Sequence, residues 1–188
     1  MKIFNVFTIQ EELSMRAMEL KKMMVLDNNG AEIGKLSDLG IDYDEFKIRN
    51  ILVSAGGFFS KKYFYVDVGD LDGIDTCVHV KRSEEGIDQV DLKNVTYERY
   101  FFRDFQNLYS ASADAILIGP VKDLCINLDD NLTFKPVLDA MRLCGRYRKN
   151  DCFIIDLDDI DAITEFIALN LTKDEIKQRI KDYDVKEC

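Results

Sequence analysis

The chain has 188 residues, of which 47% are hydrophobic and 32% are charged, and its formal net charge is −10. This composition is typical of a soluble globular protein with room for one ordinary domain or two of about 80–100 residues. No apolar run approaches the roughly 20 residues that span a bilayer, and the first residues lack the apolar segment of a secretory signal. We therefore expect a cytoplasmic protein with no membrane insertion.

The acidic charge disfavours nonspecific nucleic-acid binding, because neutralising phosphates requires a basic surface. Five cysteines are scattered along the chain without a C-x-x-C pair. An odd number without such a pair predicts neither a disulfide framework nor a zinc knuckle, so we expect buried or idle thiols.

In the first part of the chain, residues 8–11 (TIQE) have a helix-capping pattern ahead of Leu13 and Ala17 and predict a short N-terminal helix. Residues 23–26 followed by residues 27–30 (DNNG) predict a strand that enters a tight turn, since Asn and Gly tolerate positive φ. Residues 45–49 and 76–81 alternate polar and apolar side chains, as strands with one buried face do.

An internal repeat organises the rest of the sequence. Residues 33–42 (IGKLSDLGID) align with residues 118–127 (IGPVKDLCIN), 85 positions later, and residues 64–74 align with residues 153–163, 89 positions later. A longer hairpin loop in the second copy accounts for the difference, because loops absorb insertions at little cost. The repeat predicts two copies of one small β-barrel domain.

The segments outside the two copies have helical patterns. Tyr97, Phe101, Phe105 and Leu108 recur at helical spacing and predict a helix between the barrels. Residues 172–175 (TKDE) form a capping box ahead of an apolar stripe and predict a C-terminal helix. The predicted organisation is an N-terminal extension (1–17), a first domain (18–84), a linker or connecting helix (85–105), a second domain (106–171) and the C-terminal helix (172–188).

Residues 30–38 (GAEIGKLSD), with the predicted strand before them and residues 66–74 (VDVGDLDGI) after them, resemble a PRC-barrel domain. Gly30 would serve a turn, and Gly34 would serve a bulge or a close backbone approach. The second copy departs from the pattern, since Ala115 stands where Gly30 does.

The resemblance implies a mainly β fold of two tandem PRC-type barrels and a non-enzymatic role in docking onto another macromolecule. Members of the family occur in the photosynthetic reaction-centre H subunit, in the ribosome-maturation factor RimM and in small archaeal proteins that include cell-division scaffolds. The chain most resembles the stand-alone archaeal type. Because the shared motifs are glycines and apolar positions, they specify a fold better than a function.

Residues 156–161 (DLDDID) do not fit the calcium-loop pattern, and a solvated acidic turn that caps a short helix is the better interpretation. His79 is the only histidine, and together with Cys77 it would supply only two metal ligands. Phosphate-loop, dinucleotide and nucleophile-elbow motifs do not occur. The sequence therefore predicts no catalytic residues, no metal and no cofactor.

Cationic side chains lie near aromatic ones in two hairpin loops at equivalent places in the two copies. They are the candidate partner-binding residues Phe58, Phe59, Lys61, Lys62, Arg146, Tyr147, Arg148 and Lys149. Such tips could grip phosphate or an acidic partner, or they could be solvated loops whose charges balance nearby acids. Two hypotheses follow: a scaffold that binds another protein and also itself, and, as the alternative, an RNA- or ribosome-associated factor that resembles RimM.

Overall fold

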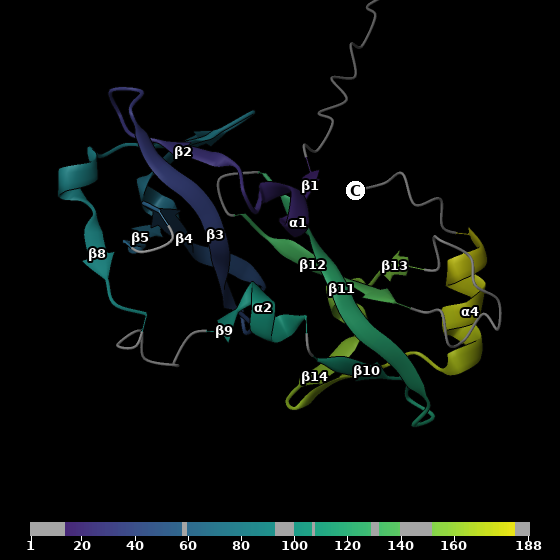
Figure 1. Ribbon diagram of the computed structural model, residues 1–188. Coiled ribbons are helices and arrows are strands. Elements are labelled where there is room, and N and C mark those ends of the chain that lie inside the picture. The colour runs from purple at the N-terminus through teal and green to yellow at the C-terminus, as the bar shows by residue number, and fades with distance from the viewer. Residues whose placement is uncertain are drawn as a thin grey trace, which may run out of the picture.

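The computed structural model (Figure 1) describes residues 14–57, 60–92, 100–106, 108–128, 132–139 and 152–182. Within these ranges the chain is mainly β, as the sequence predicts, and its strands form two sheets. No helix in these ranges is long and apolar enough to cross a membrane.

The first sheet has the strand order β6-β7-β2-β3-β4-β5-β8. Its strands are β2 (Met24–Leu26), β3 (Glu32–Asp42), β4 (Lys47–Ala55), β5 (Lys62–Asp67), β6 (Leu71–Ile74), β7 (Val78–Val80) and β8 (Asp88–Val90). The short 3-10 helices η1 (Val68–Asp70) and η2 (Glu84–Gly86) connect some of them. In β5, Phe64 and Val66 are buried while Tyr63 and Tyr65 are half-buried, the alternation expected of a strand with one face on the core.

The second sheet repeats this topology with the order β13-β12-β11-β10-β15-β14. Its strands are β10 (Tyr109–Ala111), β11 (Leu117–Asn127), β12 (Phe134–Asp139), β13 (Cys152–Ile154), β14 (Ile160–Ile163) and β15 (Phe166–Leu169), with η3 (Leu157–Asp159) before β14. In both sheets the first strand of the copy pairs in parallel with the last one, β2 with β7 and β10 with β15. The other strand pairs within each order are antiparallel.

Each half of the chain also lends a strand and a helical turn to the other half. The segment β1 (Ser14–Arg16) and α1 (Ala17–Leu20) precedes the first sheet, but β1 pairs with β11 of the second. The segment β9 (Tyr100–Phe101) and α2 (Phe102–Phe105) precedes the second sheet, but β9 pairs with β3 of the first. The registers are equivalent, because Arg16 lies opposite Cys125 and Phe101 lies opposite Gly40, each pair displaced by 85 positions.

Two buried carboxylates, Asp38 and Asp123, lie at equivalent positions where these exchanged segments begin their helical turns. Asp123 Oδ1 accepts the backbone N–H of Met18 at 3.1 Å and that of Leu124 at 2.9 Å. Asp38 accepts the backbone N–H of Leu39 at 3.0 Å and a backbone hydrogen bond from Arg103. Each carboxylate thus caps the first turn of the helix that comes from the other half, whose N–H groups have no partner within the helix.

One hydrophobic core runs through both sheets. At the junction, the ring of Phe134 on β12 lies 6.0 Å from that of Phe105 on α2 and 5.7 Å from that of Phe46, centroid to centroid. Tyr43 in the β3–β4 turn contacts Phe105 at 5.2 Å. These rings come from both halves, so the apolar surface of each sheet is buried in part by the other.

Gly34 and Gly30 have the structural roles that the sequence predicts. A Cβ at Gly34 would lie 2.4 Å from the carbonyl oxygen of Ser54 on β4, so only glycine permits this close approach of β3 and β4. Gly30 has φ +79° in the β2–β3 turn, and Ala115 has φ +58° at the equivalent place in the β10–β11 turn. The second copy therefore keeps the turn and accepts the strain of an alanine in the left-handed region.

The predicted helices have different outcomes. The C-terminal one is confirmed as α4 (Lys173–Asp182). The connecting helix is wrong for the residues that the structure describes: Phe101 lies in β9, Phe105 ends the single turn α2, and Leu108 precedes β10, because pairing with β3 fixes Phe101 in a strand. Tyr97, the first residue of the predicted stripe, lies outside the described ranges. The predicted N-terminal helix begins among residues 1–13, outside the described ranges.

The cysteines depart in part from the expectation of free thiols. Cys77 is free and half-buried. Cys125 on β11 is disulfide-bonded, so the expectation is wrong for this residue.

Substitutions at the two equivalent turns should shift stability in opposite directions. Ala115→Gly relieves left-handed strain and should raise the free energy of unfolding by about 0.5–1 kcal/mol, whereas Gly30→Ala should lower it by a similar amount. A Cβ at Gly30 meets no atom within 4 Å, so the positive φ is the only source of strain for an alanine at this position. Urea denaturation checks both variants, and equal signs would contradict the argument.

The two buried carboxylates should titrate abnormally. Burial raises the pKa of Asp38 and Asp123 above the ordinary value of 3.8, whereas the hydrogen bond from Ser112 lowers the pKa of Asp114 below it. Because the folded pKa of Asp123 is raised, its contribution to the free energy of unfolding should fall as pH rises from about 3.8 through the folded pKa. Carboxyl ¹³C NMR measures the order of these pKa values, and an Asp123 pKa below that of Asp114 would refute the prediction.

Candidate functional site

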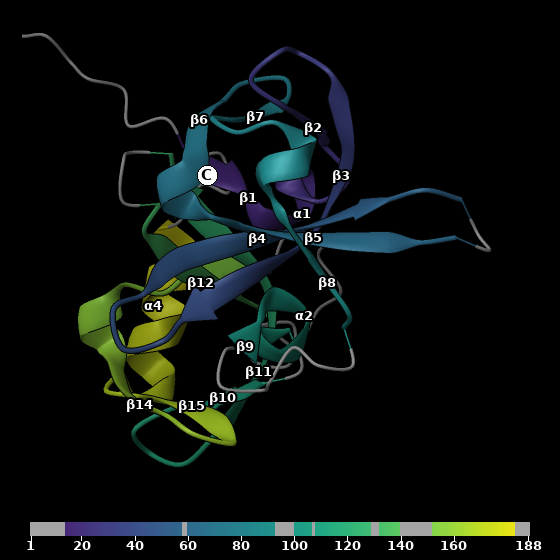
Figure 2. The same cartoon turned by 90° about the vertical axis from the view of Figure 1, so that its left-hand side faces the viewer.

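The structure describes only part of the predicted basic tips. Lys61 and Lys62 are exposed at the end of the β4–β5 hairpin, which projects from the body of the molecule (Figure 2). The Lys61 ammonium lies 5.4 Å from the ring centroid of Tyr63, a cation–π distance. The six other candidates lie outside the described residues, and they are Phe58, Phe59, Arg146, Tyr147, Arg148 and Lys149. Their grouping with the two lysines stays a prediction.

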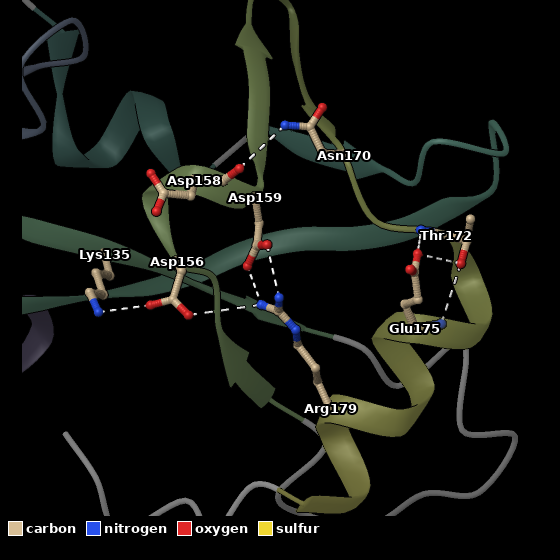
Figure 3. Close-up of polar contacts among 8 residues, drawn as sticks. All are labelled: Lys135, Asp156, Asp158, Asp159, Asn170, Thr172, Glu175 and Arg179. Atoms are coloured by element: carbon tan, nitrogen blue, oxygen red, sulfur yellow. Dashed lines mark hydrogen bonds and ion pairs between the residues drawn. The ribbon is translucent and has the colours of Figure 1, made fainter.

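The acidic segment of residues 156–161 is bound by basic side chains (Figure 3). The guanidinium of Arg179 on α4 forms two hydrogen bonds to the buried carboxylate of Asp159, with its Nη1 and with its Nη2 at 2.9 Å, and lies 3.9 Å from Asp156. Lys135 on β12 contacts Asp156 at 2.8 Å. Two of the four carboxylates in this segment, Asp156 and Asp159, are thus paired with arginine and lysine.

The α4 helix is fixed at its start as well. Thr172 and Glu175 form the predicted capping box, since Glu175 Oε2 accepts the Thr172 backbone N–H at 2.7 Å and the Thr172 Oγ1 hydroxyl at 2.6 Å. The backbone N–H of Lys173 donates to Asp114 in the β10–β11 turn at 3.0 Å. Ile176 is fully buried. These contacts fix helix α4 against the second sheet.

His79 contacts the Asp75 carboxylate at 3.2 Å, and the same oxygen accepts the backbone N–H of Cys77 at 2.8 Å. This is a local turn interaction on an exposed edge. Across the part of the chain that the structure describes, no group of three or more His, Cys, Asp or Glu residues could hold a metal ion.

A hollow of about 330 Å³ lies where the first half meets the second. Its described wall consists of Val68, Gly69, Leu71, Asp72, Gly73, Ile74, Lys81, Leu128 and Leu132. The Lys81 ammonium donates to the Gly69 carbonyl at 3.0 Å. The ionisable side chains of this wall are those of Asp72 and Lys81.

The most distinctive surface of the described residues is the outward side of the second sheet, formed by β10, β11, β14 and β15. Tyr109, Leu117 and Phe166 are 42%, 45% and 47% exposed there, while their neighbours Ser110, Ile118 and Ile167 point inward and are fully buried. We call this surface the apolar face. Its residues are Tyr109, Ala111, Leu117, Pro120, Ala162, Phe166 and Ala168.

The register brings these side chains into two rows across the strands. In one row Tyr109 lies opposite Pro120 on one side and Phe166 on the other. In the second row Ala111 lies opposite Leu117 and Ala168, and Ala168 lies opposite Ala162. Both rows are free of charged side chains.

The first sheet has an equivalent surface, and its side chains can be compared directly with those of the apolar face. The residues that correspond to the apolar face, 85 or 89 positions earlier, are Met24, Leu26, Glu32, Lys35, Gly73, Cys77 and His79. Glu32 and Lys35 are exposed there, where the second sheet has Leu117 and Pro120. Because the two sheets share one topology, the loss of charge on the second is a property of its side chains and not of the fold.

Sequence reasoning missed the apolar face. Strands β10, β14 and β15 have only three or four residues each. The sequence of such a short strand does not show whether an apolar side chain points inward or outward. The repeat held a usable signal, since aligning the two copies position by position pairs charged residues with apolar ones.

Residues 12–87 match the family model of the PRC-barrel domain. The match spans β1 to η2 and confirms the resemblance for the first half of the chain. No curated protein matches the sequence.

The contacts of α4 give a prediction with a matched control. Arg179→Met leaves the Asp159 carboxylate, which is 8% exposed, without its charged partner and should lower the free energy of unfolding by about 1–3 kcal/mol. Lys135→Met breaks only the exposed pair with Asp156 and should cost less than about 1 kcal/mol. Denaturant titration measures both, and equal losses would show that the Arg179 contact is not special.

Proposed function

We propose that this chain, whose residues 12–87 are a PRC-barrel domain, is a non-enzymatic scaffold that binds protein. The observation that carries the proposal is the apolar face, an uncharged patch on a protein with a net charge of −10. Contiguous exposed apolar patches mark interaction sites, because the free energy falls when another molecule covers apolar surface that was exposed to water.

Aromatic side chains on this face favour protein as the bound molecule. Tyr and Phe supply large, rigid contact areas at low entropic cost and are enriched at the centres of protein interfaces. A nucleic-acid site would instead need cations beside the rings, and the two rows of the apolar face contain none.

We infer that the second sheet is a divergent copy of the PRC-barrel domain, which makes the chain a tandem protein. The shared strand order and the equivalent registers of β1 and β9 support this duplication. The expected domain limits of 18–84 and 106–171 belong to the same proposal. An assembly such as the archaeal cell-division apparatus, in the cytoplasm, is the setting that we propose.

One observation favours the second candidate function, an RNA- or ribosome-associated factor that resembles RimM. Lys61 and Lys62 are exposed beside Tyr63 at the tip of a projecting hairpin, where an RNA backbone could reach them. Binding through these lysines would weaken steeply with salt.

A tagged pull-down from native lysate, with and without nuclease, separates the two candidates. The scaffold predicts protein partners that survive nuclease treatment and that both Lys62→Glu and its control Lys35→Glu retain. Both lysines are exposed on strands of the first sheet, but only Lys62 lies at the hairpin tip. Ribosomal proteins that vanish with nuclease and with Lys62→Glu, but not with Lys35→Glu, would overturn the scaffold in favour of RNA binding.

A further inference from the structure

We propose that the N-terminal segment (residues 1–13), which lies outside the described ranges, places its apolar side chains in the hollow between the two halves of its own chain. Three observations support the inference: the apolar wall of the hollow, the place at which the segment joins the structure, and the small side chains on this side of the junction. The hollow is distinct from the apolar face, and the inference does not depend on the proposed function.

The wall of the hollow is a part of the core that is only partly covered. Val68, Leu71 and Ile74 from the first half and Leu128 from the second are half-buried and pack against the core cluster, to which Leu132 belongs. These five side chains line the hollow of about 330 Å³. A further apolar group placed there would lower the free energy, because it removes apolar surface from water.

The N-terminal segment joins the structure next to this hollow. It leads into β1, in which Ser14 lies opposite Asn127, the last residue of β11. Because the pairing is antiparallel, the chain before Ser14 continues in the direction of Leu128, which follows Asn127 and lines the hollow. Thirteen extended residues span about 40 Å, so the segment is long enough to reach the wall.

The composition of the segment suits an apolar cavity. Residues 3–9 (IFNVFTI) contain five large apolar side chains and no charged one. Two of these side chains are the aromatic rings of Phe4 and Phe7, which have large apolar surfaces. A run of this kind is favoured where apolar surface can cover it, and the hollow offers such surface within reach.

The two turns that meet at the junction are related by a local two-fold symmetry. The backbone N–H of Ile48 donates to the carbonyl of Leu132 at 3.0 Å, and that of Phe134 donates to the carbonyl of Phe46 at 3.0 Å. Exchanging the two halves therefore matches Leu132 with Phe46. The side of the junction that holds Phe46 thus shows how much space the other side contains.

Side chains at the matched positions are larger in the first half. Tyr43 and Phe46 stand where the wall of the hollow has Leu128 and Leu132, and the ring of Tyr43 lies 5.2 Å from that of Phe105. A leucine fills less volume than an aromatic ring, and protein interiors are close-packed. The side with the two leucines therefore has space for further apolar groups, and the aromatic side chains of the N-terminal segment supply them.

Isotope-edited NMR of the full chain tests the proposal directly. Nuclear Overhauser contacts should join the ring protons of Phe4 or Phe7 to the methyl groups of Leu128 and Leu132. In a mixture of labelled and unlabelled chains, these contacts should not occur between different molecules. Contacts between copies would overturn the inference, as would contacts of the same rings with Phe166 of the apolar face, or no contacts at all.

Chymotrypsin cleavage after Phe4 and Phe7 gives a second measurement. Docking of the segment should slow this cleavage by about 10-fold or more relative to a free peptide of residues 1–13, since proteolysis requires an opened chain. Leu128→Asp places a charge in the wall and should return cleavage to nearly the rate of the peptide. The matched control is Leu117→Asp, because Leu117 begins β11, is 45% exposed and does not line the hollow. It should leave the protection unchanged.

Val6→Asp tests the same contact without changing the folded core, because it alters the segment and not the wall. It should remove the protection when cleavage is compared with a peptide that carries the same substitution. Circular dichroism confirms that each variant is folded. A wild-type chain cleaved at the rate of the peptide would refute the inference. Protection that Leu117→Asp removes and Leu128→Asp does not would also refute it, since the segment would then lie on the apolar face.

Discussion

Two carboxylates hold the molecule together where its halves exchange segments. Asp123 accepts backbone N–H groups from α1, and Asp38 accepts one from α2, so each buried acid caps a helical turn that the other half supplies. The strands attached to these turns, β1 and β9, complete the opposite sheets. Burial raises the pKa of both acids, because it disfavours the charged carboxylate, and the backbone hydrogen bonds act in the opposite direction. The nearby cations Lys21 and Arg103 also favour the charged form of Asp38.

The exchange determines which surfaces are left for binding. Since β1 and β9 lie against β11 and β3, the ends of these long strands and the aromatic cluster of Phe46, Phe105 and Phe134 are buried between the halves. The parts of the sheets around β10 and β2 point away from the junction. These outward sides are equivalent by topology and differ in their side chains, since Glu32 and Lys35 on the first sheet stand where the second has Leu117 and Pro120. The two sheets thus present the same strand arrangement with different side chains on their outward sides.

Local features were predictable from the sequence, and long-range pairing was not. Gly34 within a predicted strand indicated a bulge or a close backbone approach, of which the structure shows the latter, and residues 172–175 encode a helix start within four positions. By contrast, β9 has two residues and pairs with a strand about 60 positions earlier, so nothing local distinguishes it from the helix that its aromatic spacing suggested. Arg179 gave no signal either, because its partner Asp159 lies on another element and only the folded chain brings them together. The apolar face was hidden for the same reason: a short apolar strand is read as core until its neighbours are placed.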